Sequence, residues 1–319
     1  MTAENVEFID MKPELASFRD EVLQGLSKNP KRIPPKFFYD DRGSELFVKI
    51  TRTPEYYVTR TEEEILGKFG EEISETIDKG TFVIEYGSGN SEKTSMLISS
   101  LDSPFAYVLI DISSDAVRNS ADLLSSRFPD LKIISICADY LRMHEIPEQD
   151  PNRKKVIVFL GSTIGNFEPD DAKGFLELVQ SELNDGDGML VGVDLRKDIK
   201  TLNAAYNDSE GYTARFNLNL LRRIGKELET DINPEKFAHK AYYNRELGRI
   251  EMHLVSLENQ EVMIEGMKFR FDRGETIHTE SSYKYTVEDF SRLAEKSGLK
   301  VKKNWQDSRG YFSLLYLTK

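Results

Sequence analysis

The chain has 319 residues, of which 39% are hydrophobic and 31% are charged, which is typical of globular proteins and not of disordered ones. Its 55 acidic and 43 basic residues give a formal net charge of −12, which disfavours non-specific binding to nucleic acid. Cys137 is the only cysteine, so no intramolecular disulfide can form, and we expect a cytoplasmic protein.

The first 60 residues combine a predicted helix with aromatic-rich segments. Apolar residues recur at helical spacing over residues 14–27 and predict a helix there. A connector with prolines follows, and then two stretches rich in phenylalanine and tyrosine, residues 37–41 and 51–57. We expect the next helix to run to about residue 78.

From residue 81 the pattern becomes strand, turn and helix, repeated. The predicted strands are the short apolar runs Phe82–Tyr86, Ala106–Ile110, Lys132–Cys137, Lys155–Leu160 and Gly188–Val193. The predicted helices are Ser91–Leu101, Ser114–Arg127 and Pro169–Leu183. Nearly continuous apolar strands that alternate with helices are typical of a parallel sheet covered on both faces. The sequence therefore predicts an α/β protein with a Rossmann-like domain.

After residue 196 the rhythm changes. Residues 199–228 read as largely helical, and residues 237–270 alternate apolar and polar side chains, which predicts antiparallel strands. A further strand within 274–285, a helix over 286–297 and two terminal strands complete the chain. We predict a Rossmann-like domain from residues 61–196 plus 286–319, and a smaller α+β domain from residues 1–60 plus 197–285.

A glycine-rich turn ends the first strand of the Rossmann-like domain. Gly87 and Gly89 would let a ligand approach the backbone, and Asp111, at the end of the second strand, is placed to accept hydrogen bonds from ribose hydroxyls. Glu92 stands where a dinucleotide motif has its third glycine, and its charge would repel a pyrophosphate. With Asp139 after the third strand, this pattern favours S-adenosylmethionine over a dinucleotide, although a plain tight turn is the simplest alternative.

The sequence also predicts what the chain lacks. It contains no run of about 18 apolar residues, so we expect no membrane span. The acidic stretch after Met1 resembles neither a signal peptide nor a transit peptide. The four histidines are scattered and the chain has one cysteine, so we expect no zinc site and no other metal.

Long collinear segments from about residue 30 to the C-terminus match one known family. The matching segments are 36–40, 43–47, 50–57, 59–60, 85–89, 91–94, 161–167, 194–195, 197–198, 205–208, 216–219 and 279–282. On these segments the chain resembles the histidine-specific Nα-methyltransferases of ergothioneine biosynthesis, which form hercynine. The resemblance implies a Rossmann-like class I methyltransferase domain with a second, smaller α+β substrate-binding domain. It also implies L-histidine as the substrate and S-adenosylmethionine as the methyl donor, with no metal, and we expect a monomer.

The resemblance implies a role for each matching residue. Asn166 and Tyr206 would bind the substrate carboxylate. The imidazole would lie among Tyr56, Glu280, Ser282 and Met252. Tyr39 would lie near the reacting amine, as the catalytic residue, and near the cofactor. The other cofactor residues would be Gly87, Lys93, Asp111, Asp139 and Tyr140.

Several alternatives stay open at this point. Tyr57 is as eligible for the pocket as its neighbour Tyr56, and a glutamate such as Glu280 is more often a solvated surface acid than a ligand. A related enzyme could methylate tryptophan or another amino acid. The chain could also be a nicotinamide-dependent oxidoreductase, which Glu92 disfavours, or a non-catalytic amino-acid sensor, which Asp111 and Asp139 disfavour.

Overall fold

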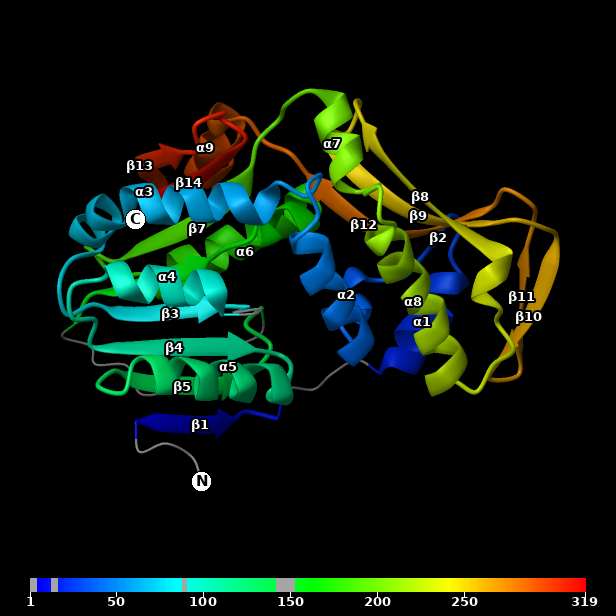
Figure 1. The fold of residues 1–319 in the computed structure, drawn as a ribbon, viewed down its shortest axis with the longest axis horizontal. Helices are drawn as coiled ribbons and strands as arrows, with labels where there is room; N and C mark the ends of the chain where they lie inside the picture. The colour runs from blue at the N-terminus through cyan, green and yellow to red at the C-terminus, as the bar shows by residue number, and fades with distance from the viewer. Residues whose placement is uncertain (1–4, 13–16, 88–90, 142–152) are drawn as a thin grey trace. The chain divides into compact units, whose positions relative to one another are not determined.

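The computed structural model describes residues 5–12, 17–87, 91–141 and 153–319. The chain divides into two compact units (Figure 1). The first unit is made of Met1–Glu14, Val58–Arg196 and Tyr285–Lys319, and the second of Leu15–Tyr57 and Lys197–Lys284. Each unit is described separately below.

An eight-stranded sheet forms the centre of the first unit. In sheet order its strands are β1 (Val6–Asp10), β5 (Lys132–Cys137), β4 (Ala106–Asp111), β3 (Phe82–Tyr86), β6 (Lys155–Phe159), β7 (Gly188–Asp194), β14 (Phe312–Thr318) and β13 (Lys300–Gln306). The strands from β1 to β7 are parallel, and β14 is antiparallel to both of its neighbours. Every residue of β3, β6 and β7 is buried, so these strands have no solvent-exposed face, as the apolar runs predicted.

Helices cover both faces of this sheet. They are α3 (Val58–Ile77), α4 (Glu92–Ser100), α5 (Ser114–Arg127), the 3₁₀ helix η2 (Thr163–Asn166), α6 (Pro169–Glu182) and α9 (Val287–Lys296). Figure 1 shows α3, α4 and α5 in front of the strands, whereas α6 and α9 pack together and contribute to a core behind them. The predicted Rossmann-like α/β fold is confirmed.

The order of the strands fixes where a ligand site can form. The chain runs from β3 outward to β4 and β5 on one side, and then from β6 outward to β7 on the other. The direction in which successive strands are added to the sheet therefore reverses between β3 and β6. In open α/β sheets, ligands bind beyond the carboxyl ends of the strands at this reversal. The loops after β3 and β6, which contain Gly87 and Gly161, lie at that place.

The second unit is an α+β structure. Its four-stranded sheet has the order β2 (Lys31–Arg32), β12 (Thr276–Tyr283), β9 (Arg249–Ser256), β8 (Phe237–Asn244), and a separate hairpin joins β10 (Gln260–Ile264) to β11 (Met267–Phe271). Its helices are α1 (Phe18–Leu26), η1 (Pro35–Phe38), α2 (Asp41–Thr51), α7 (Ile199–Ala205), α8 (Tyr212–Glu227) and η3 (Pro234–Lys236). The strands β8 and β9 are antiparallel, as are β9 and β12.

Two asparagines on α8 connect the parts of the second unit. Asn217 is fully buried and donates to the backbone oxygen of His253, while its own oxygen accepts from the Thr279 hydroxyl at 2.8 Å. Asn219 donates to the Asp40 carboxylate at 2.7 Å, and the same carboxylate oxygen caps α2 by accepting from Gly43 N–H. The first contact ties α8 to the sheet, and the second ties it to the start of α2.

Three features differ from the sequence prediction. Residues 1–60 were assigned to the smaller domain, but β1 pairs in parallel with β5 and extends the large sheet. The helix α2 was not predicted, because its apolar positions are few and aromatic residues flank it. The region 199–228, predicted as largely helical, is two helices, α7 and α8. The second begins separately because the Asp208 carboxylate accepts from the backbone N–H groups of Tyr212 and Thr213 at its start.

We predict that Asn217→Ala destabilises the protein by about 2 kcal/mol or more, because the buried Thr279 hydroxyl and His253 carbonyl each lose a partner. Thermal or denaturant unfolding measures the change. Lys226→Ala, an exposed substitution on the same helix, serves as the control and should leave stability nearly unchanged. Equal effects of the two substitutions would contradict the role given to Asn217.

Candidate functional site

The first strand of the parallel array ends in a turn that leaves space for a ligand. Gly87 has φ of +71°, a left-handed conformation that favours glycine, and nothing lies within 4 Å of the position that a Cβ would occupy. Its backbone N–H donates to the Ile110 oxygen at 2.9 Å, which holds the turn against β4. The rest of the predicted glycine motif, Ser88 and Gly89, lies outside the described residues.

Two acids follow the neighbouring strands. Asp111 ends β4, and its partner across the ladder is Cys137, the last residue of β5, with Asp139 two residues further on. Burial raises the pKa of Asp111, while its carboxylate accepts from the backbone N–H of Ser113 at 2.9 Å. Asp139 accepts from the backbone N–H of Leu141 at 3.1 Å. The structure therefore brings both predicted acids to one edge of the sheet.

An aromatic stack supports the residue after Asp139. The rings of Tyr86 and Tyr140 lie 5.0 Å apart at an angle of 6°, and the buried Tyr86 hydroxyl donates to the Glu182 carboxylate at 2.8 Å. Burial and the charges of Asp111 and Asp139 raise the pKa of Tyr140, so this ring lies close to both acids. Tyr86, the last residue of β3, thus fixes the orientation of Tyr140.

Lys93 forms a buried ion pair at the reversal point of the sheet. Its amino group donates to the Glu62 carboxylate, which is fully buried and also accepts from the backbone N–H of Gly161 at 2.9 and 3.0 Å. A Cβ on Gly161 would come within 3.2 Å of the Lys93 nitrogen. The three groups together join the loops after β3 and β6.

Sequence reasoning missed Glu62, although the sequence contains a signal for it. Glu62 precedes Ile65 by three residues and Leu66 by four, so helical periodicity places it on the buried face of α3. An acid on an apolar face must be paired, because an isolated buried charge is costly. Its partner is Lys93, which the resemblance had assigned to the cofactor alone.

Asn166 ends η2, in the segment that follows β6. It is partly exposed, and its side-chain amide makes no hydrogen bond within the described residues. An amide without a partner offers two donors and an acceptor to a ligand. Its position at the carboxyl edge of the sheet agrees with the prediction of a ligand-binding role.

In the second unit, one face of β12 presents a row of polar groups. Glu280 and Ser282 alternate along β12, so their side chains point to the same side, and Lys284, just past the end of the strand, donates to Ser282. Met252 on β9 is the register partner of Glu280 and is 1% exposed. Three residues that the sequence assigned to the imidazole site, Glu280, Ser282 and Met252, thus lie together, and Lys284 joins them.

The carboxylate of Glu280 is available to a ligand. The residue is partly buried, and burial raises its pKa to about 7, an effect that the charge of Lys284 opposes. Within the described residues, no hydrogen bond reaches its side chain. An unsatisfied carboxylate in such surroundings is a candidate binding group, since pairing with a donor would offset its cost of desolvation.

Lys284 was not predicted, and it lies at the centre of the polar row. The side chain is 2% exposed, and its amino group donates to the Ser282 hydroxyl at 2.7 Å and to the Tyr206 hydroxyl at 3.2 Å. Tyr206 donates in turn to Ser282 at 3.0 Å. The signal that could have found it is its spacing of two residues from Ser282 in an extended segment, which favours the same side for both side chains.

Aromatic rings line the same cluster. Tyr56 packs edge-on against Tyr206, with ring centroids 6.4 Å apart, and against Phe47 at 6.1 Å. The neighbouring Tyr57 has another partner, since its hydroxyl accepts from Lys197 at 2.7 Å. These contacts place Tyr56, and not Tyr57, beside the other residues predicted to bind substrate.

Tyr39 contacts the same group of rings. Its ring centroid lies 5.7 Å from that of Phe47 and 5.7 Å from that of Phe216. Although 48% of the residue is exposed, the surrounding protein and the charges of Glu280 and Tyr206 raise the pKa of its hydroxyl. Tyr39 is therefore a neutral hydroxyl near Glu280 and not a tyrosinate base.

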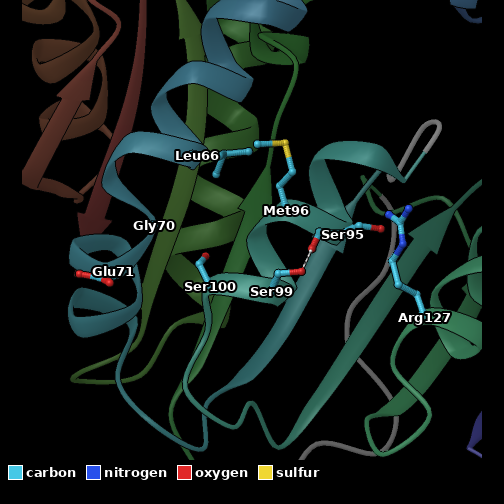
Figure 2. A pocket seen from close by; sticks show the side chains of 9 residues that line it. Leu66, Gly70, Glu71, Ser95, Met96, Ser99, Ser100 and Arg127 are labelled. Atoms are coloured by element: carbon cyan, nitrogen blue, oxygen red, sulfur yellow. Dashed lines mark hydrogen bonds between the residues drawn. The ribbon is translucent and has the colours of Figure 1, made fainter.

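A groove elsewhere on the first unit contains none of the predicted residues. Figure 2 shows it between α3 and α4, lined by Leu66, Gly67, Gly70, Ser95 and Met96 among others. Its lining also includes Glu71 on α3 and Arg127 at the end of α5. Since no residue that the sequence assigned to cofactor or substrate lines it, the groove is not the predicted site.

Comparison with known proteins decides between the alternatives. A family model described as histidine-specific methyltransferase, SAM-dependent, matches residues 18–319. This chain belongs to that family. The histidine N-alpha-methyltransferase of Mycobacterium tuberculosis is 38% identical, covering 93% of this chain and 94% of that protein. The enzyme of the same name from Mycolicibacterium smegmatis is 36% identical, covering 98% of each.

A longer relative matches over part of its length. Ergothioneine biosynthesis protein 1 of Neurospora crassa is 32% identical over 95% of this chain, which corresponds to 34% of that protein. As a member of the histidine-specific methyltransferases, the chain is an enzyme that uses S-adenosylmethionine. The family therefore removes the oxidoreductase and sensor alternatives.

The groups at the edge of the large sheet fit the methyl donor of this family. Gly87 leaves open space, Asp111 and Asp139 provide acceptors for hydroxyl and amino groups, and Tyr140 offers an aromatic face. Among the described residues there is no group of three or more histidine, cysteine or acidic side chains that could hold a metal ion. None of the described helices is both long and apolar enough to cross a membrane.

We predict that Asp111→Ala weakens cofactor binding about 10-fold to 100-fold, because a charged acceptor contributes about 1.5–3 kcal/mol to its hydrogen bonds. Calorimetric titration with S-adenosylhomocysteine measures the dissociation constant. Asp122→Ala, which removes an exposed acid from the neighbouring α5, is the control. An unchanged dissociation constant in Asp111→Ala would remove this residue from the cofactor site.

Proposed function

We propose that this enzyme transfers up to three methyl groups from S-adenosylmethionine to the α-amino nitrogen of L-histidine. The product, Nα,Nα,Nα-trimethylhistidine or hercynine, would serve ergothioneine biosynthesis. The observation that carries the proposal is the Glu280 carboxylate, which is partly buried, receives no hydrogen bond from the described residues and lies beside the Ser282 hydroxyl on one strand face. A neutral imidazole has one N–H donor and one bare nitrogen acceptor, which complement these two groups.

The substrate residues divide by chemistry. Glu280 accepts from the ring N–H, Ser282 contacts the other ring nitrogen, and Tyr56 and Met252 enclose the ring with apolar surface. Asn166 binds the α-carboxylate as a neutral donor, and Tyr206, whose hydroxyl hydrogen is given to Ser282, packs against Tyr56 beside the ring. In this division, substrate binding does not depend on the hydrogens of the α-amino group. Binding can therefore persist while methyl groups replace those hydrogens one after another.

The two units have separate tasks in this proposal. The first unit binds the methyl donor through Gly87, Lys93, Asp111, Asp139 and Tyr140, and the second unit is the substrate-binding domain. In that division Glu62 keeps the charge of Lys93 in place, since it pairs with this side chain from α3. Lys93 then carries the positive charge that would meet the carboxylate of the donor.

Methyl transfer mainly requires the two reacting groups to be positioned correctly. The bound sulfonium supplies an activated methyl group, so no metal is needed to activate the methyl carbon. The protein must hold the amine in line with that carbon, an effect worth several kcal/mol. The amine must also be unprotonated; an α-amino group titrates near pH 7.7–8.0 at a peptide terminus, so part of it is already neutral. The Tyr39 hydroxyl, neutral at physiological pH, relays the released proton: it takes the proton of the amine as it passes its own to water.

The proposal is tested by incubating the protein with S-adenosylmethionine and a panel of amino acids, followed by mass analysis. We expect histidine to gain 14, 28 and then about 42 mass units as one, two and three methyl groups replace hydrogen. Tryptophan should gain none at the same concentration. A preference for tryptophan over histidine, or a product that stops at one methyl group, would contradict the proposal.

We predict that Glu280→Ala lowers kcat/KM for histidine about 10-fold to 100-fold, because the ring N–H loses its acceptor inside the pocket. The same change should raise the relative use of larger apolar side chains. Steady-state kinetics with both substrates measure the switch, and Glu246→Ala, an exposed acid of the same unit, is the control. Unaltered histidine kinetics in Glu280→Ala would disprove its role.

We further propose that the enzyme works in the cytoplasm as a monomer. The single cysteine, Cys137, is buried and suits a reducing compartment. The net charge of −12 favours separate molecules through mutual repulsion and disfavours nucleic acid as a partner. Sedimentation of the purified protein reports the oligomeric state.

A further inference from the structure

The buried lysine in the second unit constrains the hydrogen of its neighbour. An ammonium group has three donors and no acceptor. Because Lys284 donates to the Ser282 oxygen, Ser282 cannot donate back to it. The Tyr206 hydroxyl donates to the same oxygen at 3.0 Å. Both acceptor positions of the Ser282 oxygen are therefore occupied by protein groups.

The single hydrogen of Ser282 must then be donated elsewhere. Within the described residues, the Ser282 hydroxyl has no other hydrogen-bond partner. The residue is 4% exposed, so a hydrogen without an acceptor there is costly. An acceptor on a ligand would satisfy it. Lys284 and Tyr206 thus convert a hydroxyl, which normally donates or accepts, into a group that presents a donor.

Glu280 presents the opposite character. An ionised carboxylate only accepts hydrogen bonds. Lys284 lies four residues further along the chain, just past the end of β12, and its positive charge favours the ionised form of Glu280 against the effect of burial. The site therefore offers a donor from Ser282 and, in the ionised form that Lys284 favours, an acceptor from Glu280.

We propose that Lys284 is a specificity-determining residue: it fixes Ser282 as donor and Glu280 as acceptor, so that the site selects a ring with one N–H and one bare nitrogen. This inference rests on the proposed histidine methylation and extends it. An imidazole satisfies both groups in one orientation and one tautomer. An indole or a pyrrole has an N–H but no acceptor and leaves Ser282 unsatisfied, whereas a thiazole has an acceptor but no N–H and leaves Glu280 unsatisfied.

A double-mutant cycle tests the connection between Lys284 and Ser282. Lys284→Met keeps the length of the side chain and removes its donors. We expect it to raise the KM for histidine at least about 10-fold, with an unchanged dissociation constant for S-adenosylhomocysteine. In the Ser282→Ala background, Lys284→Met should raise the KM for histidine by less than about threefold, because the hydroxyl hydrogen that Lys284 orients is absent. Lys284→Arg, which retains a donor-only cation, should recover part of the affinity.

Several results would overturn the inference. Equal effects of Lys284→Met in both backgrounds would show that it does not act through Ser282. A KM effect matched by Lys240→Met, an exposed lysine on β8, would show a general effect of charge. If Lys284→Met does not fold, the wild-type enzyme decides: good turnover of pyrrolylalanine, which lacks the ring acceptor, would contradict the fixed donor. Failure of the wild type on histidine itself would instead remove the proposed function, and the inference with it.

Discussion

Charge that is taken out of water must be paired, and both units of this protein are arranged around that constraint. In the first unit the fully buried Glu62 meets Lys93 and the backbone of Gly161, so the charge is satisfied internally and the loops at the reversal point of the sheet are held in place. In the second unit the pairing is incomplete. Lys284 is satisfied by two hydroxyls, but Glu280 receives no hydrogen bond from the described residues. The difference separates Glu62, whose charge the protein itself pairs, from Glu280, whose carboxylate no described residue satisfies.

The matching segments of the family contain residues of both kinds, and the sequence alone does not sort them. Asn217 and Asn219 lie in one such segment, yet both are occupied by internal contacts with Thr279 and Asp40. Asp40 directly follows Tyr39, so the contact with Asn219 fixes the backbone from which the exposed Tyr39 ring projects. These residues serve the site without touching a ligand, because they hold the elements that carry it.

Much of the fold could be predicted from the sequence, because buried parallel strands leave a strong apolar signal. The strands from Phe82 to Asp194 were placed within a residue or two of their observed bounds. The isolated strand β1 was missed, since its partner β5 is far away in sequence. Glu62 and Lys284 were missed because a charged residue is assumed to face water unless its partner is known, and partners become visible only after folding. Tyr86 shows the same limit: the ring stack with Tyr140 and the bond to Glu182 follow from tertiary contacts alone.

Selectivity for an aromatic amino acid needs more than an apolar cavity. Rings such as Tyr56 and Phe47 attract imidazole and indole alike, and the larger ring gains more from burial. Hydrogen-bonding groups can make imidazole bind better than indole. A buried donor or acceptor left unpaired costs about 1–3 kcal/mol, which is comparable with what the larger ring gains from burial. A carboxylate alone discriminates poorly, since indole also carries an N–H. A second group of fixed opposite character is required, and only a donor-only neighbour such as Lys284 can fix a hydroxyl in that role.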